Sequence, residues 1–143
     1  MPGNTPQTDV QVLCFPIDKF LIASPLTGTT GSLDLCLLGC PDQAGYVLEF
    51  LSVSYVAHTL PADGSAINVD IEFIDDSDSD TVTDLLENFD LTSGTARVVT
   101  QIWRGSQILD PGDVINAEFT TDGSITAGHG QSLIVEFRVL KRS

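Results

Sequence analysis

Two stretches of the chain alternate apolar and polar residues with a period of two. In "INVDIEFI" every second residue from Ile67 to Phe73 is apolar, and in "SLIVEFRVL" every second residue from Leu133 to Val139 is apolar. A β-strand buries such a pattern on one face, whereas a helix with 3.6 residues per turn cannot. The alternation therefore predicts strands with one buried and one wet side.

Clusters of turn-forming residues separate these segments from their neighbours. "LPADGS", "DPGD", "TDGS" and "AGHGQ" combine glycine, proline, aspartate and serine, which preset or tolerate the backbone angles of turns. Short strands at intervals of about ten residues, joined by such turns, are typical of a β-sandwich. We therefore expect an all-β chain with a β-sandwich or jelly-roll fold.

One segment departs from the period of two and predicts a short helix. In "SDTVTDLLENFDL" four apolar residues fall at the spacing i, i+3, i+4 and i+7: Val82, Leu85, Leu86 and Phe89. This is the stripe of an amphipathic helix. Ser79 or Asp80 would cap its first turn.

The N-terminal third of the chain has a different character from the rest. Residues 1–10 contain two prolines and a glycine without an apolar pattern, so they predict an extended arm. Short apolar runs and turn clusters follow up to residue 45. We therefore divide the chain into residues 1–45, an extended arm with strand-like segments, and residues 46–143, the sandwich.

The segment from Tyr46 to His58 is apolar on both of its faces. Five residues carry this pattern, two on one face and three on the other: Leu48 and Phe50, then Leu51, Val53 and Tyr55. A strand that is wet on one side does not have this composition. A helix, the N-terminal segment or a neighbouring subunit must cover it, and we expect these residues to form an interface between identical subunits.

The charge of the chain is strongly negative and unevenly distributed. Twenty acidic residues against six basic ones give a net charge of -14. This argues against binding to nucleic acid, which requires a basic surface. No base occurs between Lys19 and Arg97, and three bases crowd into the C-terminus: Arg138, Lys141 and Arg142. We expect this basic end to contact the acidic flank of a neighbouring subunit.

The run "DDSDSD" invites comparison with a calcium-binding loop. Four acids match the spacing of an EF-hand at positions 1, 3, 5 and 12: Asp76, Asp78, Asp80 and Glu87. Position 6 is Thr81, where the loop needs glycine, and the expected helix would begin inside the loop. We therefore predict a solvent-facing turn without tightly bound calcium, and no cofactor elsewhere.

No arrangement of residues indicates catalysis. His58 and His129 are far apart in the sequence, and neither stands in a metal-binding spacing. A nucleophile elbow and a phosphate-binding glycine loop are both lacking. The polar start "MPGNTPQTDV" does not have the form of a signal peptide, and no apolar run is long enough to span a membrane. We expect a protein that is not an enzyme and does not bind membranes.

The second half of the chain resembles a family of small virion proteins. The segments that carry this resemblance are "YVLEFLSVSYVAHTLPADGSAINVDIEF", "DTVTDLLENFDL" and "ILDPGDVINAEFTTDGSITAGHGQSLIVEFRV", within residues 46–140. They are similar in style to the jelly-roll modules of capsid decoration (cement) proteins of tailed bacteriophages. The resemblance implies a homotrimer that binds the major capsid protein on the capsid surface, in a particle assembled in the host cytoplasm.

A second interpretation remains open at this point. The chain could be a carbohydrate- or receptor-binding module of a phage tail fibre or appendage. Such a module needs exposed aromatic residues for sugar stacking. Only ten aromatic residues are present, and several occupy core-like positions in the predicted strands, including Phe50 and Phe119.

Overall fold

The computed structural model describes residues 9–18, 31–43, 45–61, 67–121 and 128–141. The elements that lie wholly within these residues are eight strands and one short 3-10 helix: β1 (Gln11–Pro16), β2 (Gly31–Gly39), β3 (Tyr46–Val56), β4 (Ile67–Asp75), η1 (Asp76–Asp78), β5 (Thr81–Asp90), β6 (Thr100–Leu109), β7 (Val114–Thr121) and β8 (Ser132–Lys141). In the described part of the chain, no helix is long and apolar enough to cross a membrane.

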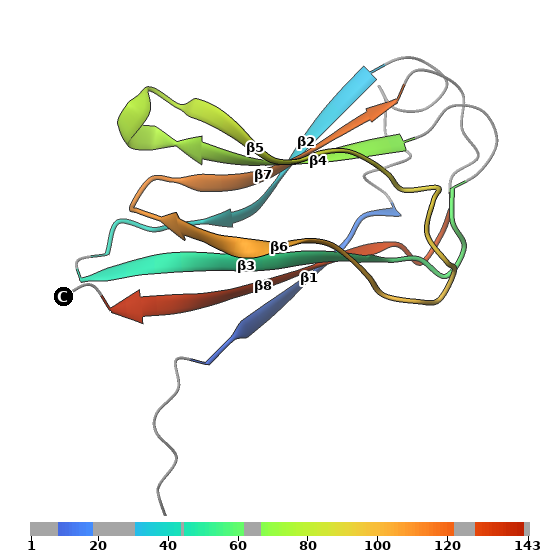
Figure 1. The fold of residues 1–143 in the computed structure, drawn as a ribbon, viewed down its shortest axis with the longest axis horizontal. Helices are drawn as coiled ribbons and strands as arrows, with labels where there is room; N and C mark the ends of the chain where they lie inside the picture. The colour runs from blue at the N-terminus through green and yellow to red at the C-terminus, as the bar shows by residue number, and fades with distance from the viewer. Residues whose placement is uncertain (1–8, 19–30, 44, 62–66, 122–127, 142–143) are drawn as a thin grey trace, which may run out of the picture.

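The strands form two antiparallel sheets of four, with the orders β1-β8-β3-β6 and β2-β7-β4-β5. The pairs β1–β8, β2–β7, β3–β6 and β4–β5 are nested in the sequence, as if one long hairpin had been rolled up. This is the connectivity of a jelly roll. Figure 1 shows the two sheets as two layers, which confirms the expected all-β sandwich.

Strands from residues 1–45 belong to both layers. β1 pairs with β8 in one sheet, and β2 pairs with β7 in the other. The sandwich therefore begins before residue 46, and the boundary placed there does not separate the strand-like segments from the fold. Residues 1–8, which make up most of the predicted arm, lie outside the described residues.

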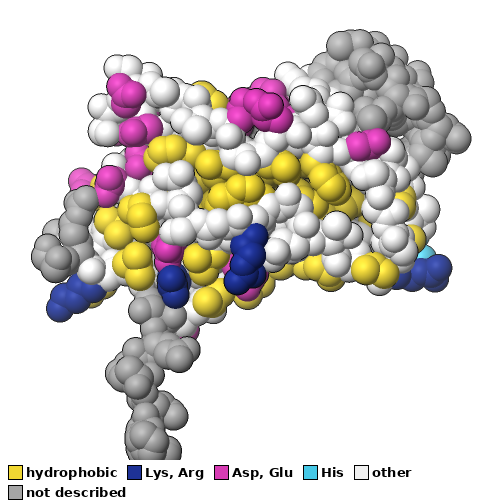
Figure 2. Space-filling model, in the orientation of Figure 1, with side chains coloured by type: hydrophobic (Ala, Val, Ile, Leu, Met, Phe, Trp, Pro, Cys, Tyr) yellow, Lys and Arg dark blue, Asp and Glu magenta, His cyan; other side chains and the backbone are white. Residues whose placement is uncertain are grey.

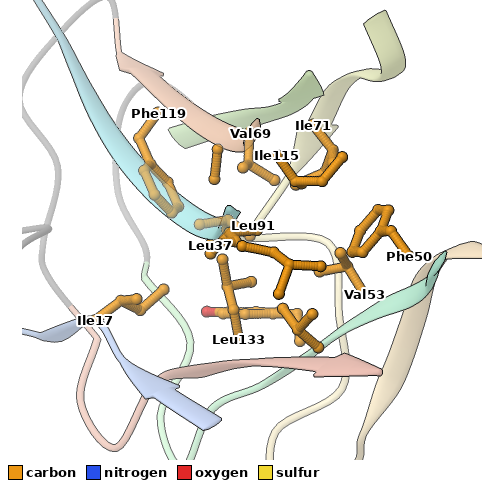
Figure 3. Packing of buried hydrophobic residues seen from close by; sticks show 14 of the residues in the cluster. Ile17, Leu37, Phe50, Val53, Val69, Ile71, Leu91, Ile115, Phe119 and Leu133 are labelled. Atoms are coloured by element: carbon orange, nitrogen blue, oxygen red, sulfur yellow. The ribbon is translucent and has the colours of Figure 1, made fainter. Parts of the chain in front are cut away.

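The core lies between the two layers, where the inward side chains of both sheets meet (Figure 3). The alternation predicts this correctly for the first half of β4 and of β8: Ile67, Val69 and Ile71 are fully buried, as are Leu133 and Val135. Toward the ends of these strands the burial decreases, since Phe73 and Phe137 are half-buried and Val139 is 38% exposed. Complete burial of one such aliphatic side chain contributes about 1.5–3 kcal/mol relative to exposure. The wet face of each strand carries the intervening polar residues.

β3 is not apolar on both faces, because a bulge changes which of its residues point inward. Between Phe50 and Ser52 the strand advances two residues while β8 advances one, from Phe137 to Glu136. The extra residue is Leu51. A bulge of this kind switches the side-chain phase of all the residues that follow it.

The switch places four apolar residues of β3 in the same core: Leu48 and Phe50 before the bulge, and Val53 and Tyr55 after it. Their exposed fractions do not exceed 8%. The prediction that these four form a subunit interface is therefore wrong, because the chain buries them itself. Leu51 is half-buried at the bulge.

The predicted helix over residues 79–91 is also wrong, and bulges are again the reason. This segment forms β5, which pairs with β4. Its register shifts twice, once between the pairs Val69–Phe89 and Ile71–Leu86 and once directly after Ile71. Two extra residues in the strand interrupt the regular spacing of two between its apolar residues. The irregular spacing that results resembles the apolar stripe of a helix.

One of these bulges has a defined polar anchor. Asn88 has a positive φ of 53°, in the left-handed region. Its backbone N–H donates to the Asp70 Oδ1 atom of β4 at 2.6 Å. Asparagine tolerates this conformation better than most residues do, because its short side chain bonds locally.

A substitution at Asn88 tests this account of β5. Asn88→Gly should leave stability near that of the wild type, because glycine adopts a positive φ freely. Asn88→Val should lower the free energy of unfolding by about 1–2 kcal/mol, because a β-branched residue is strained there. Urea denaturation measures both changes. The matched control is Thr83→Val on the same strand, which should cost nothing, and equal stability of both valine variants would contradict the bulge.

Candidate interface surfaces

The acidic run "DDSDSD" forms an exposed turn between β4 and β5. The Asp75 carboxylate accepts hydrogen bonds from the Ser77 backbone N–H at 3.0 Å and from the Ser77 hydroxyl at 2.7 Å. Ser79 and Asp80 then adopt positive φ values of 55° and 58°, which reverse the chain. The turn is solvent-facing as predicted, but it leads into a strand and not into a helix.

A buried carboxylate anchors this turn to the adjacent one. Asp113 is only 3% exposed. Its Oδ1 atom accepts a hydrogen bond from the Asp76 N–H at 3.0 Å, and its Oδ2 atom accepts one from the Asp110 N–H at 2.9 Å. The "DPGD" turn between β6 and β7 is thereby tied to the start of η1. The carboxylates of Asp75 and Asp113 thus have a structural role.

The four acids that match the EF-hand spacing do not come together in the structure. Glu87 lies in β5, where its side chain interacts with Asp84 and not with the turn that carries Asp76, Asp78 and Asp80. Within the described residues, the acids whose oxygen atoms come within 4.8 Å of one another are a different set: Asp34, Glu72 and Glu118.

These three acids belong to what we call the acidic face, the outer surface of the β2-β7-β4-β5 sheet. Six carboxylates contribute to it, from all four strands: Asp34, Asp70, Glu72, Asp84, Glu87 and Glu118. Glu118 of β7 stands directly opposite Asp34 on one side and Asp70 on the other. Like charges in directly opposed positions repel each other. The acidic face is therefore held in place against its own electrostatic repulsion.

Asn116 relieves part of this repulsion. It is 5% exposed, and its side-chain amide donates to Asp34 Oδ1 at 3.0 Å and to Glu72 Oε1 at 2.9 Å. One amide group thus bridges carboxylates from β2 and β4. The two carboxylates and Glu118 offer oxygen atoms of the type that hard divalent cations bind.

Two of the acids on this face have raised pKa values. Burial raises the pKa of Glu118, and the negative charges of Glu72, Asp34, Asp70 and Asp84 raise it further. The pKa of Glu87 is also raised, first by its hydrogen bond with Asp84 and then by the negative charge of that residue. Both shifts favour the protonated form on the folded protein.

The opposite sheet presents a different outer face. There Glu49 of β3 forms an ion pair with Arg138 of β8 and accepts a hydrogen bond from the Ser106 hydroxyl of β6. The hydrogen bond from Arg138 holds the pKa of Glu49 below its usual range, with help from Ser106. Next to this group, Ser52 donates to Glu136 at 2.6 Å.

The predicted basic end of the chain is only partly available for a contact with another subunit. The Arg138 side chain is 39% exposed but is engaged with Glu49 of its own chain. Lys141 is exposed at the end of β8, and Arg142 lies outside the described residues. The predicted contact between the acidic flank and these bases remains a prediction.

A cluster at one end of the sandwich was not expected from the sequence. His58 and His129 stack with their ring centroids 5.0 Å apart, and both contact the Thr59 hydroxyl. Nearby, Asp18 accepts hydrogen bonds from the Gly130 and Gln131 amides. Burial raises the pKa of Asp18, but these hydrogen bonds outweigh that effect and lower it overall. Only pairing between distant segments brings these residues together.

Comparisons with known proteins add little to this description of the surfaces. No protein-family model matches the chain, and no curated protein matches it. Among solved structures, the chain is similar to a chain in the structure of infectious bursal disease virus, Gt strain, with 12% identity and a TM-score of 0.35. The match covers 99% of this chain and 42% of that one. A likeness of this size carries no argument about fold or function.

Replacing Glu118 tests the strain in the acidic face. Because the pKa of Glu118 is raised in the folded state, its ionised carboxylate lowers the free energy of unfolding at pH values above the folded-state pKa. This loss disappears at pH values below the pKa of the unfolded chain, near 4.5, where the group is protonated in both states. Glu118→Gln should therefore stabilise the protein at pH 7, by about 0.2–1 kcal/mol for each opposed like-charged pair removed. The gain should vanish at pH 4.

Thermal unfolding at both pH values gives the comparison. Asp42→Asn, at an exposed position between β2 and β3, is the control and should change little at either pH. Destabilisation by Glu118→Gln at pH 7 would show that the carboxylate has a favourable role in the fold.

Proposed function

We propose that the chain is a non-enzymatic structural protein of a virion, a decoration protein that binds the assembled capsid of a tailed bacteriophage as an oligomer. The jelly roll supports a role of this kind, since capsid domains use this fold, but lectins and cupins use it too. Fold alone therefore does not decide the function. The acidic face carries the proposal.

The acidic face suits contact with a basic protein surface. Its carboxylates stand on paired strands, so they need no ordering of loops when a partner binds. Such a field of one sign accelerates association with an oppositely charged surface and rejects surfaces of like charge. It also disfavours the phosphate backbone of nucleic acid.

The raised pKa of Glu118 is consistent with this role. A carboxylate crowded by its neighbours gains more from a cation or a basic side chain than an isolated surface acid does. Binding of lysine or arginine side chains from the capsid would relieve the repulsion that the folded chain retains. The partner we propose is therefore the major capsid protein, contacted through basic residues.

Immunogold electron microscopy tests the location. Particles from the source are purified on a density gradient and labelled with an antibody against the purified chain. We expect gold label on the outer surface of the capsids. If full particles carry no label and the chain is found only outside the particle fraction, a virion role is excluded.

Rebinding to the same particles tests the surface. After removal of the endogenous protein with salt, the variant Asp34→Asn/Glu72→Gln/Glu118→Gln should bind at least about tenfold more weakly than wild type. The control Asp42→Asn should bind like wild type. Equal binding of the triple variant would show that another surface makes the contact.

A further inference from the structure

An apolar seam runs along one open side of the sandwich. β5 and β6 are the outermost strands of their sheets on this side. Five side chains from the two strands are half-buried and pack on the edge of the core: Leu85, Leu86, Phe89, Ile102 and Trp103. Figure 2 shows hydrophobic side chains gathered in a band between the two layers. We call these five residues the seam.

The seam is rigid. Trp103 stacks on the buried Phe50 ring, with centroids 4.7 Å apart and planes 6° from parallel. It lies over Gly105, where a Cβ atom would stand 2.7 Å from the indole ring. The indole is therefore fixed by packing on both the core and the strand. A fixed aromatic side chain loses little entropy when a partner covers it.

The free edges of β5 and β6 are poor templates for an added strand. Bulges interrupt β5 near Leu85 and Asn88, and another bulge at Ile102 interrupts β6. Bulges twist an edge and break the regular row of backbone hydrogen-bonding groups. A partner that covers the seam must therefore dock through side chains.

Charges of opposite sign border the two long sides of the seam. The exposed acids Asp84 and Glu87 lie on β5, and the exposed Arg104 lies on β6. In Figure 2 acidic side chains gather above the hydrophobic band, and the lysine and arginine side chains, with some acids among them, lie below it. The surface thus has an acidic rim, an apolar centre and a basic rim.

We propose that the seam binds the seam of a second copy of this chain, about a two-fold axis that runs along the strands. Rotation about this axis turns the acidic rim of one copy toward the basic rim of the other, and places apolar centre on apolar centre. Such an isologous contact uses the same patch twice. It also completes the burial of the half-buried apolar side chains of the seam.

The size of the surface is adequate for a stable pair. Each edge strand has ten residues, and therefore a length of about 33 Å. Two sheets about 10 Å apart, together with the width of their edge strands, give a face of roughly 700 Å². Standard interfaces bury about 800 Å² per partner.

This inference specifies the oligomer of the proposed function as a two-fold dimer. The two proposals fail separately, because gold label on capsids does not depend on the oligomeric state of the free protein. Likewise, a dimer in solution does not require a virion.

Sedimentation velocity of the purified chain measures the association. Concentrations of about 10–100 µM cover the dissociation constants of transient and stable dimers. We expect a species of twice the 15.3 kDa chain mass. Asp84→Arg alone and Arg104→Glu alone should each raise the dimer dissociation constant at least about tenfold, because like charges then face each other. The double variant should regain the wild-type value, because the exchanged rims match again.

Both charged positions are exposed, so these variants should fold, and circular dichroism verifies this. Val12→Asp, on the exposed edge strand β1 at the other side of the sandwich, is the matched control and should dimerise normally. A wild-type monomer or trimer would overturn the proposal. So would a dimer that either single reversal leaves intact, or one that the double variant does not restore.

Discussion

The bulge at Leu51 is the constraint on which the rest of the structure depends. β3 is the strand that holds one sheet together, because it pairs with β8 on one side and β6 on the other. Four of its apolar residues face the core, at even positions before the bulge (Leu48, Phe50) and at odd positions after it (Val53, Tyr55). Without the phase change, the second half of the strand would turn Val53 and Tyr55 to solvent, and Ser52 and Ser54 inward.

Bulges also explain how much of the fold the sequence reveals. β4 and β8 keep an inward alternation over their central residues, so their buried faces follow directly from the sequence. β3 and β5 each contain extra residues, and a period of two with insertions resembles a two-sided strand in one case and a helix in the other. Propensity and periodicity describe single segments, whereas a bulge is defined only by the partner strand.

The candidate surfaces were hidden for a related reason. Asp34, Glu72 and Glu118 lie on three strands that are neighbours only in the rolled-up jelly roll. Each looks in the sequence like an ordinary wet position, and the conspicuous aspartates of "DDSDSD" serve a turn instead. What could be anticipated was the excess of acids. Their concentration on one sheet face, opposite a sheet that carries Arg104 and Arg138, can be recognised only when the strand order is known.

Deletion of Leu51 is the most direct test of this account. Removing the bulge while keeping every other residue should force either the first or the second half of β3 out of phase with the core. Two large apolar residues would then be exposed, and either Glu49 or the pair Ser52 and Ser54 would face the core. This should cost about 5 kcal/mol or more, a large part of the stability of a domain of this size. In urea denaturation followed by circular dichroism, the account predicts a protein that is unfolded or close to it in water. A cooperative transition at the wild-type midpoint would contradict it.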